Sequence, residues 1–191
     1  MGGVNSAAPD DGRPALDEAS RPTGPQPTAD TRDAVAAGRH LIEVHDYLRA
    51  DLACVRETLR QVAAGEAEVG TARGQLADIT RRANAWTLGG LCQGYCRILA
   101  HHHSLDSEGI FPYLRARQAD LGAGLDRLHE EHEVIHWLLE DVDAALVRLA
   151  TDPTDLGPVT DAVDQLTETL LSHFAYEERE LVAPLARYGF F

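Results

Sequence analysis

Residues 125–146 read LDRLHEEHEVIHWLLEDVDAAL. One stripe recurs through them at intervals of three and four: Leu125, Leu128, His132, Ile135, Leu139, Val142 and Leu146. This spacing predicts an amphipathic helix over residues 123–150. An α-helix turns by about 100° per residue, so residues four apart lie one turn apart on nearly the same face. We therefore expect His132 and His136 to face the same neighbours.

The same pairing of metal-binding residue types occurs on either side of this helix. His102 precedes Asp106 by four residues, and His173 precedes Glu177 by four, whereas His45 stands alone. Each lies on an apolar stripe of its own segment. The stripes predict helices at 32–64, 71–84, 87–118, 123–150 and 156–188. Long amphipathic helices joined by short loops favour an all-α fold, an antiparallel up-down-up-down four-helix bundle over residues 31–191.

Glycines and prolines mark the irregular parts of this plan. Gly89, Gly90 and Gly94 weaken their helix and could let a neighbouring helix approach closely. Pro112 predicts a kink or break near Gly109. Residues 1–30 hold five of the nine prolines and show no apolar period, so we expect a disordered tail.

Composition excludes several classes of partner. The 191 residues carry a net charge of −14 and have a pI of about 4.9, which argues against nucleic acid and anionic membranes as partners. No apolar run reaches the length of a spanning helix, and the N-terminus does not resemble a signal peptide. Three cysteines without a disulfide-like framework fit a reducing compartment. We expect a cytoplasmic protein.

The histidines and carboxylates together predict a metal site. Burying so many polar groups at one level is costly unless a cation neutralises the carboxylates and uses the imidazole lone pairs. The alternative is a hydrogen-bonded polar core without metal. Five imidazoles and two carboxylates suit iron, or less specifically manganese or zinc. The predicted ligands are His45, His102, Asp106, His132, His136, His173 and Glu177.

Neighbouring residues leave some choices open. His101 and His103 flank His102 at about 100° on either side, so we expect them at helix interfaces or on the surface. Glu177 is better aligned with His173 than Glu178 is, although Glu178 would serve if the helix were distorted.

Four stretches resemble the hemerythrin-like proteins, the HHE cation-binding domain family. They are HDYLRADL from His45, HHHSLDSEGIFP from His101, EHEVIHWLL from Glu131 and HFAYEERELVAPL from His173. The resemblance implies a non-haem centre of two iron ions bridged by Asp106 and Glu177. It further implies a small-molecule ligand: dioxygen, nitric oxide or peroxide. Asp106 departs from the family pattern, which has Glu there, and its shorter side chain puts bridging in question.

Three functions remain open from the sequence. The histidine-rich ligand set favours a protein that binds or senses a small molecule. A second interpretation is an oxidoreductase that oxidises an organic substrate or decomposes peroxide, which predicts a substrate-sized pocket beside the metals. The third is a non-catalytic iron or oxygen sensor. The oligomeric state cannot be inferred.

Overall fold

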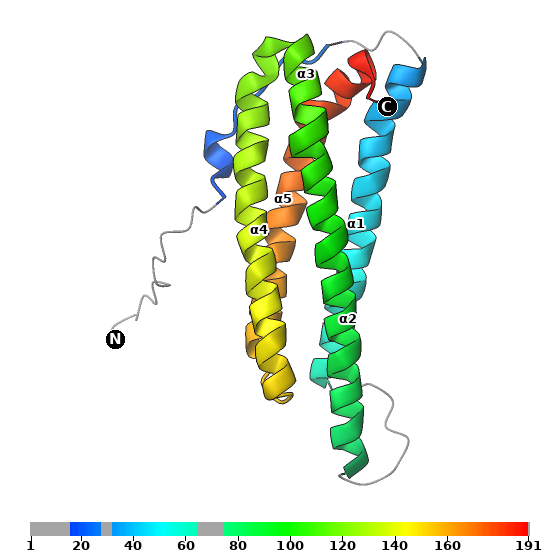
Figure 1. Cartoon of the computed structure of the whole chain (residues 1–191), viewed down its shortest axis with the longest axis vertical. Coiled ribbons are helices and arrows are strands. Elements are labelled where there is room, and N and C mark those ends of the chain that lie inside the picture. Colours follow the sequence, from blue (N-terminus) through cyan, green and yellow to red (C-terminus); the bar gives the residue numbers. More distant parts are fainter. Residues whose placement is uncertain (1–15, 28–31, 65–74, 191) are drawn as a thin grey trace, which may run out of the picture.

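The computed structural model describes residues 16–27, 32–64 and 75–190, and every regular element within them is helical. The four long helices lie side by side in Figure 1. They are α1 (Arg32–Ala64), α2 (Gln75–Leu105), α4 (Gly122–Thr151) and α5 (Gly157–Tyr188). Shorter elements are η1 (Glu18–Ser20), a π-helix η2 (Asp106–Ile110), α3 (Phe111–Arg117) and η3 (Ala119–Leu121). The prediction of an all-α fold is confirmed.

Each long helix packs against two others. Helix α1 contacts α5 and α2, and α4 contacts the same two helices. The four helices therefore enclose one interior, which residues from all of them fill.

The apolar side chains in that interior form two separate clusters. The larger cluster includes Leu52, Leu99, Leu139 and Leu170. The smaller cluster includes Leu41, Leu114, Leu128 and Leu181. Along α1, α4 and α5 the chain passes from one cluster to the other, whereas α2 contributes only to the larger cluster and α3, which follows it, to the smaller one. The polar residues of the interior lie at the crossing.

The second predicted helical region differs from the structure in one respect. The stretches expected at 71–84 and 87–118 form one continuous helix, α2, from Gln75 to Leu105, while residues 71–74 lie outside the described residues. The expected break near Gly109 takes the form of the π-helix η2. Pro112 has no N–H to offer the carbonyl four residues earlier, and the amide of Phe111 donates instead to the carbonyl of Asp106, five residues earlier.

The prediction of a close helix approach at the glycines of α2 is wrong. A Cβ at Gly89, Gly90 or Gly94 would meet nothing within 4 Å. The close approach occurs instead between α1 and α5, where a Cβ at Gly38 would lie 2.5 Å from the carbonyl oxygen of Val182. Only glycine fits at that contact.

The prediction of a disordered tail is wrong for residues 16–27. These residues, which we call the N-terminal strap, lie against α4 and α5 and include the one-turn helix η1. Polar contacts hold the strap where the sequence shows no apolar period. Residues 1–15 and 28–30 lie outside the described residues. No helix of the described residues is both long and apolar enough to cross a membrane.

Candidate metal centre

Seven buried polar side chains meet at one level of the interior, between the two apolar clusters. On α1 the order is Leu41 in the smaller cluster, His45, and Leu48 in the larger cluster. Helices α4 and α5 cross from cluster to cluster at the same level, and α2 ends there, at Leu105. No member of the set is more than 9% exposed; it consists of His45, His102, His103, Asp106, His132, His173 and Glu177. We call these seven residues the polar cluster.

The polar cluster contains two separate groups of three residues and a third group that connects them. His103, His132 and His173 form one group, and His45, His102 and Glu177 form the other. A third group, Asp106, His132 and Glu177, shares a member with each. Within every group the ligand atoms lie within 4.8 Å of one another. The arrangement therefore offers two adjacent positions for a cation.

Glu177 stands between the two groups. Its Oε2 lies 3.3 Å from Nε2 of His45 and 3.4 Å from Nε2 of His173. The Nε2 atoms of His45 and His102 are 3.1 Å apart. The nitrogens that converge on the interior are thus Nε2 atoms, one from each of several rings.

The opposite nitrogens of three rings have partners outside the polar cluster. Nδ1 of His45 is 2.9 Å from a carboxylate oxygen of Glu178, and Nδ1 of His132 is 2.8 Å from the hydroxyl of Ser107. Nδ1 of His173 is 3.0 Å from Oε2 of Glu131. Histidines that bind metals usually have such a partner, because it fixes the ring and its tautomer and leaves Nε2 free.

Several side-chain atoms of the polar cluster are buried without a hydrogen bond. In the described residues these are Nε2 of His103, His132 and His173, Oδ2 of Asp106 and both carboxylate oxygens of Glu177. Buried polar atoms in native proteins nearly always have a partner, and leaving one without costs about 1–3 kcal/mol. Imidazole nitrogens and carboxylate oxygens are ligands that iron, manganese and zinc accept. The residues present therefore fit a pair of transition-metal ions.

Burial holds three of the imidazoles in the neutral form, which binds metal. Burial lowers the pKa of His102 to about 4, although the carboxylate of Glu177 opposes the shift. Burial, together with the neighbouring imidazole of His132, lowers the pKa of His103 well below its usual value. The pKa of His132 is also well below its usual value, because of burial and of His173. All three rings are neutral at pH 7 and keep a lone pair.

The pKa values of the two buried carboxylates, Asp106 and Glu177, are shifted in opposite directions. Burial raises the pKa of Asp106 well above its usual value, and the nearby carboxylate of Glu177 adds to the shift. Burial also disfavours the charged form of Glu177, but His173 and His45 lie against its carboxylate and hold its pKa well below the usual value. A cation between the two would favour the charged form of both.

Comparison with known proteins agrees with this geometry. A model of the family described as the hemerythrin HHE cation binding domain matches residues 36–185. This chain belongs to that family. No curated protein and no solved structure matched the chain. The matched region of this HHE domain contains the whole polar cluster but not the strap.

One predicted ligand of the HHE domain lies elsewhere. His136 is on the surface of α4, 62% exposed, with Nε2 3.6 Å from a carboxylate oxygen of Glu140. The buried stripe of α4 advances by three residues from His132 to Ile135 and then by four to Leu139. His136 therefore points about 100° away from the middle of that stripe. The prediction that it faces the interior is wrong.

His103 occupies the position that His136 was expected to fill. Its ring stacks on that of His132, with ring centroids 4.1 Å apart. The signal for this was present in α2. The buried positions of α2, such as Leu99, and Asp106 directly after it have a midline that passes between His102 and His103, about 50° from each. Both rings therefore turn inward, His102 beside His45 of α1 and His103 beside His132 of α4.

The two carboxylates of the predicted set do lie in the polar cluster. Asp106 opens the π-helix, and its Oδ2 is 3.1 Å from Nδ1 of His102. Although shorter than Glu, it comes within 4.8 Å of ligand atoms of His132 and Glu177. Glu178 lies behind His45 and also accepts a hydrogen bond from Arg49 at 2.7 Å.

Proposed function

We propose that this HHE domain holds two iron ions between its long helices and binds dioxygen, or a related molecule such as nitric oxide or peroxide. The observation that carries the proposal is the set of buried nitrogens and oxygens that face one another without hydrogen bonds. Their division into two connected groups supports two ions rather than one. A closed zinc site would need only four ligands.

Each ion has a distinct set of residues to hold it. His103, His132 and His173 would hold one ion, and His45 and His102 the other. Asp106 and Glu177, which lie between the groups, would contribute to both. A pair of bound iron ions supplies the electrons that the chemistry of dioxygen requires. The protein orients the rings through Glu178, Ser107 and Glu131, and apolar clusters lie on either side of them.

The helix pairings support the antiparallel up-down-up-down bundle. Helices that follow one another pack together in the cases of α1 with α2 and α4 with α5, and the first long helix also packs against the last. In such a bundle facing helices supply the ligands of one central site. This is the arrangement that the polar cluster needs.

A groove between α1 and α2 supports a second candidate function. Its volume is about 830 Å³, and its walls are mainly apolar, with Leu41, Val44 and Ile110 among them. His102 and Asp106 also line it. Pockets of this size and character bind small organic molecules. The second candidate is therefore an oxidoreductase that acts on an apolar organic substrate in this groove.

Metal analysis and rapid mixing test the first function. The purified protein is loaded anaerobically with ferrous iron, its metal content is measured, and it is mixed with dioxygen in a stopped-flow spectrophotometer. The proposal expects about two irons per chain and a visible absorption band that disappears on deoxygenation. Failure to retain any transition metal would overturn it.

The same experiment separates the second function from the first. Repeated consumption of dioxygen in the presence of a reductant and an apolar organic compound would support the oxidoreductase. Its matched test is Val44→Trp, which fills the groove on the side of α1 without removing a member of the polar cluster. An oxidoreductase should lose turnover in this variant and keep its metal.

A further inference from the structure

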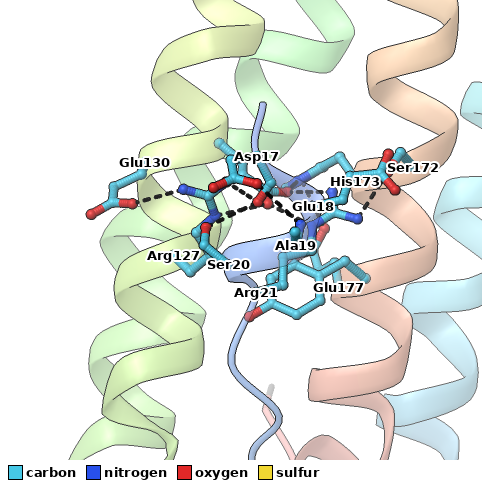
Figure 2. Close-up of polar contacts among 12 residues, drawn as sticks. Asp17, Glu18, Ala19, Ser20, Arg21, Arg127, Glu130, Ser172, His173 and Glu177 are labelled. Carbon is cyan, nitrogen blue, oxygen red and sulfur yellow. Dashed lines mark hydrogen bonds and ion pairs between the residues drawn. The ribbon is translucent and has the colours of Figure 1, made fainter. Parts of the chain in front are cut away.

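The N-terminal strap reaches the polar cluster from outside the region that matches the family. The strap ends before residue 36, where the match begins. Figure 2 shows it crossing α4 and α5 beside His173. Its backbone makes three contacts that fix its course: Asp17 O accepts from Arg127 at 2.6 Å, Pro22 O accepts from Tyr176 at 3.1 Å, and Gly24 N donates to Glu180 at 2.7 Å.

Arg21 is the strap residue that enters the protein most deeply. Its side chain is 9% exposed. Nε lies 2.8 Å from Oε1 of Glu131 and Nη2 lies 3.0 Å from Oε2, so the guanidinium grips the carboxylate with two parallel bonds. Nη1 donates to Ser172 at 2.8 Å, and the group also lies over the ring of Tyr176. Such a fork fixes the plane of a carboxylate, which a lysine cannot do.

Glu131 transmits this constraint to a member of the polar cluster. The carboxylate that Arg21 grips is 1% exposed, and its Oε2 is also the partner of Nδ1 of His173. The ring of His173 is fully buried, and its Nε2 faces Glu177. A single line of contacts therefore runs from the strap through Glu131 to a nitrogen that faces the interior.

The other oriented rings do not depend on the strap. The partner of His45 is Glu178 on α5, and the partner of His132 is Ser107 in the π-helix. Both partners lie inside the matched region. Arg127 also donates a hydrogen bond to Glu131, at 3.2 Å. The same guanidinium donates to Glu130 and to the backbone carbonyl of Asp17 in the strap. In the described residues the orientation of His173 is thus tied to a segment outside the family domain.

We propose that Arg21 is a positioning residue for the metal centre, which acts through Glu131 to hold the ring of His173, so that docking of the strap sets how tightly the centre holds metal. This inference rests on the proposed function only where it concerns metal. The orientation of His173 by Arg21 is a property of the metal-free protein and can be tested there.

The first test uses the metal-free full-length chain. Imidazole NMR compares wild type with Arg21→Gln, and with Arg56→Gln as the matched control, because Arg56 forms an exposed ion pair with Asp164. We expect the Nδ1 proton of His173 to shift and to exchange faster with solvent in Arg21→Gln. The Arg56→Gln variant should match wild type. Arg21→Lys keeps the positive charge but loses the two parallel bonds. Its His173 Nδ1 proton should have a chemical shift and an exchange rate between those of wild type and Arg21→Gln.

The second test titrates the same variants with Co²⁺ alone. Loss of an outer partner of a metal-binding histidine lowers affinity by roughly 10- to 100-fold. Because Arg127 still contacts Glu131, we expect about a tenfold loss in Arg21→Gln, at the lower end of that range, with a shift of the cobalt visible bands. Ser172→Ala removes a contact of Arg21 without changing Glu131, and it replaces Arg21→Gln in this test if that variant does not fold. It should shift the cobalt visible bands in the same direction.

The outcomes separate this inference from the proposed function. If Arg21→Gln lowers the melting temperature but leaves the His173 signal and the cobalt titration unchanged, the strap is merely structural and the inference is overturned. If the His173 signal shifts but wild type takes up no Co²⁺ or iron, the metal-binding function fails and the orientation of His173 stands.

Discussion

His103 and His136 have the same side chain but opposite environments. His103 is buried and stacks on His132, whereas His136 is exposed beside Glu140. The difference is one of angle, since each lies within one turn of another histidine of its helix. A spacing of four residues indicates a shared face, but it does not say where the middle of that face points.

The two histidines provide a matched test at this scale. Replacing His103 with Ala should lower the metal content of the loaded protein from about two ions per chain to about one, because it removes a nitrogen from one group of three. Replacing His136 with Ala should change nothing. Elemental analysis of both variants after iron loading and dialysis measures the effect. Equal metal contents in the two variants would contradict our assignment of His103.

Six of the seven members of the polar cluster could be predicted from the sequence. His45, His102, Asp106, His132, His173 and Glu177 all lie where the sequence predicted, facing one interior level. His103 was missed because consecutive residues cannot both lie at the centre of a stripe. Both turn inward when the midline of the stripe falls between them. Whether these residues bind metal stays a prediction.

At the scale of elements, helix contacts place the polar cluster. Helices α1 and α5 approach each other closely at Gly38, where a Cβ would meet the carbonyl of Val182. His45 lies two turns further along α1, and Glu177 lies at the same level of α5. A change in the separation of these helices at Gly38 should therefore also change the distance between His45 and Glu177.

Two glycine substitutions test this packing. Replacing Gly38 with Ala should destabilise the protein by about 1–3 kcal/mol, because the added methyl group forces α1 and α5 apart. Replacing Gly90 with Ala should stabilise it by up to about 1 kcal/mol, because the position faces open space within a helix. Urea unfolding of both variants gives the two free energies. A Gly38→Ala variant as stable as wild type would show that the contact is not rigid.

The π-helix is an element that composition does not reveal. Pro112 predicts an interruption, but not that the chain would remain helical through Asp106–Ile110. Replacing Pro112 with Ala restores an N–H that can bond four residues back, so we expect η2 to shift toward a regular α-helix. Asp106 and Ser107 would then rotate away from His132, and cobalt affinity should fall, by about tenfold if only the Ser107 contact is lost. Unchanged affinity would contradict a role of the π-helix in placing these residues.

At the scale of the whole molecule, a polar layer lies between two apolar clusters. Helices α1, α4 and α5 contribute to all three levels, and α2 contributes to the larger cluster and the polar layer. The periodicity of the sequence predicted that the polar and apolar residues share the buried faces. It could not predict the strap, because the strap is held by hydrogen bonds and an ion pair rather than by a periodic apolar face.

Three of the buried imidazoles make the stability of the metal-free molecule depend on pH. His102, His103 and His132 have lowered pKa values in the folded state, so the unfolded chain binds more protons from about pH 6.5 down to about pH 4. Stability should therefore fall as the pH falls through this window, by about 3 kcal/mol for His102 alone. Asp106 and His173 oppose the trend, since their raised pKa values stabilise the folded state at low pH.

Urea unfolding at several pH values measures this dependence. Replacing His102 with Gln should make the slope of stability against pH shallower, whereas His136→Ala should leave it as in wild type. A metal-free protein whose stability does not change between pH 6.5 and pH 4 would show that these rings are not buried in the neutral form.

The most direct measurement is anomalous X-ray diffraction at the iron edge, on crystals of the iron-loaded protein. Our account predicts two neighbouring anomalous peaks in the interior of each chain. One should lie among His103, His132 and His173, and the other among His45, His102 and Glu177. Iron-loaded crystals without an anomalous peak in the polar cluster, or with iron bound only at surface residues such as His136 and Glu140, would contradict it.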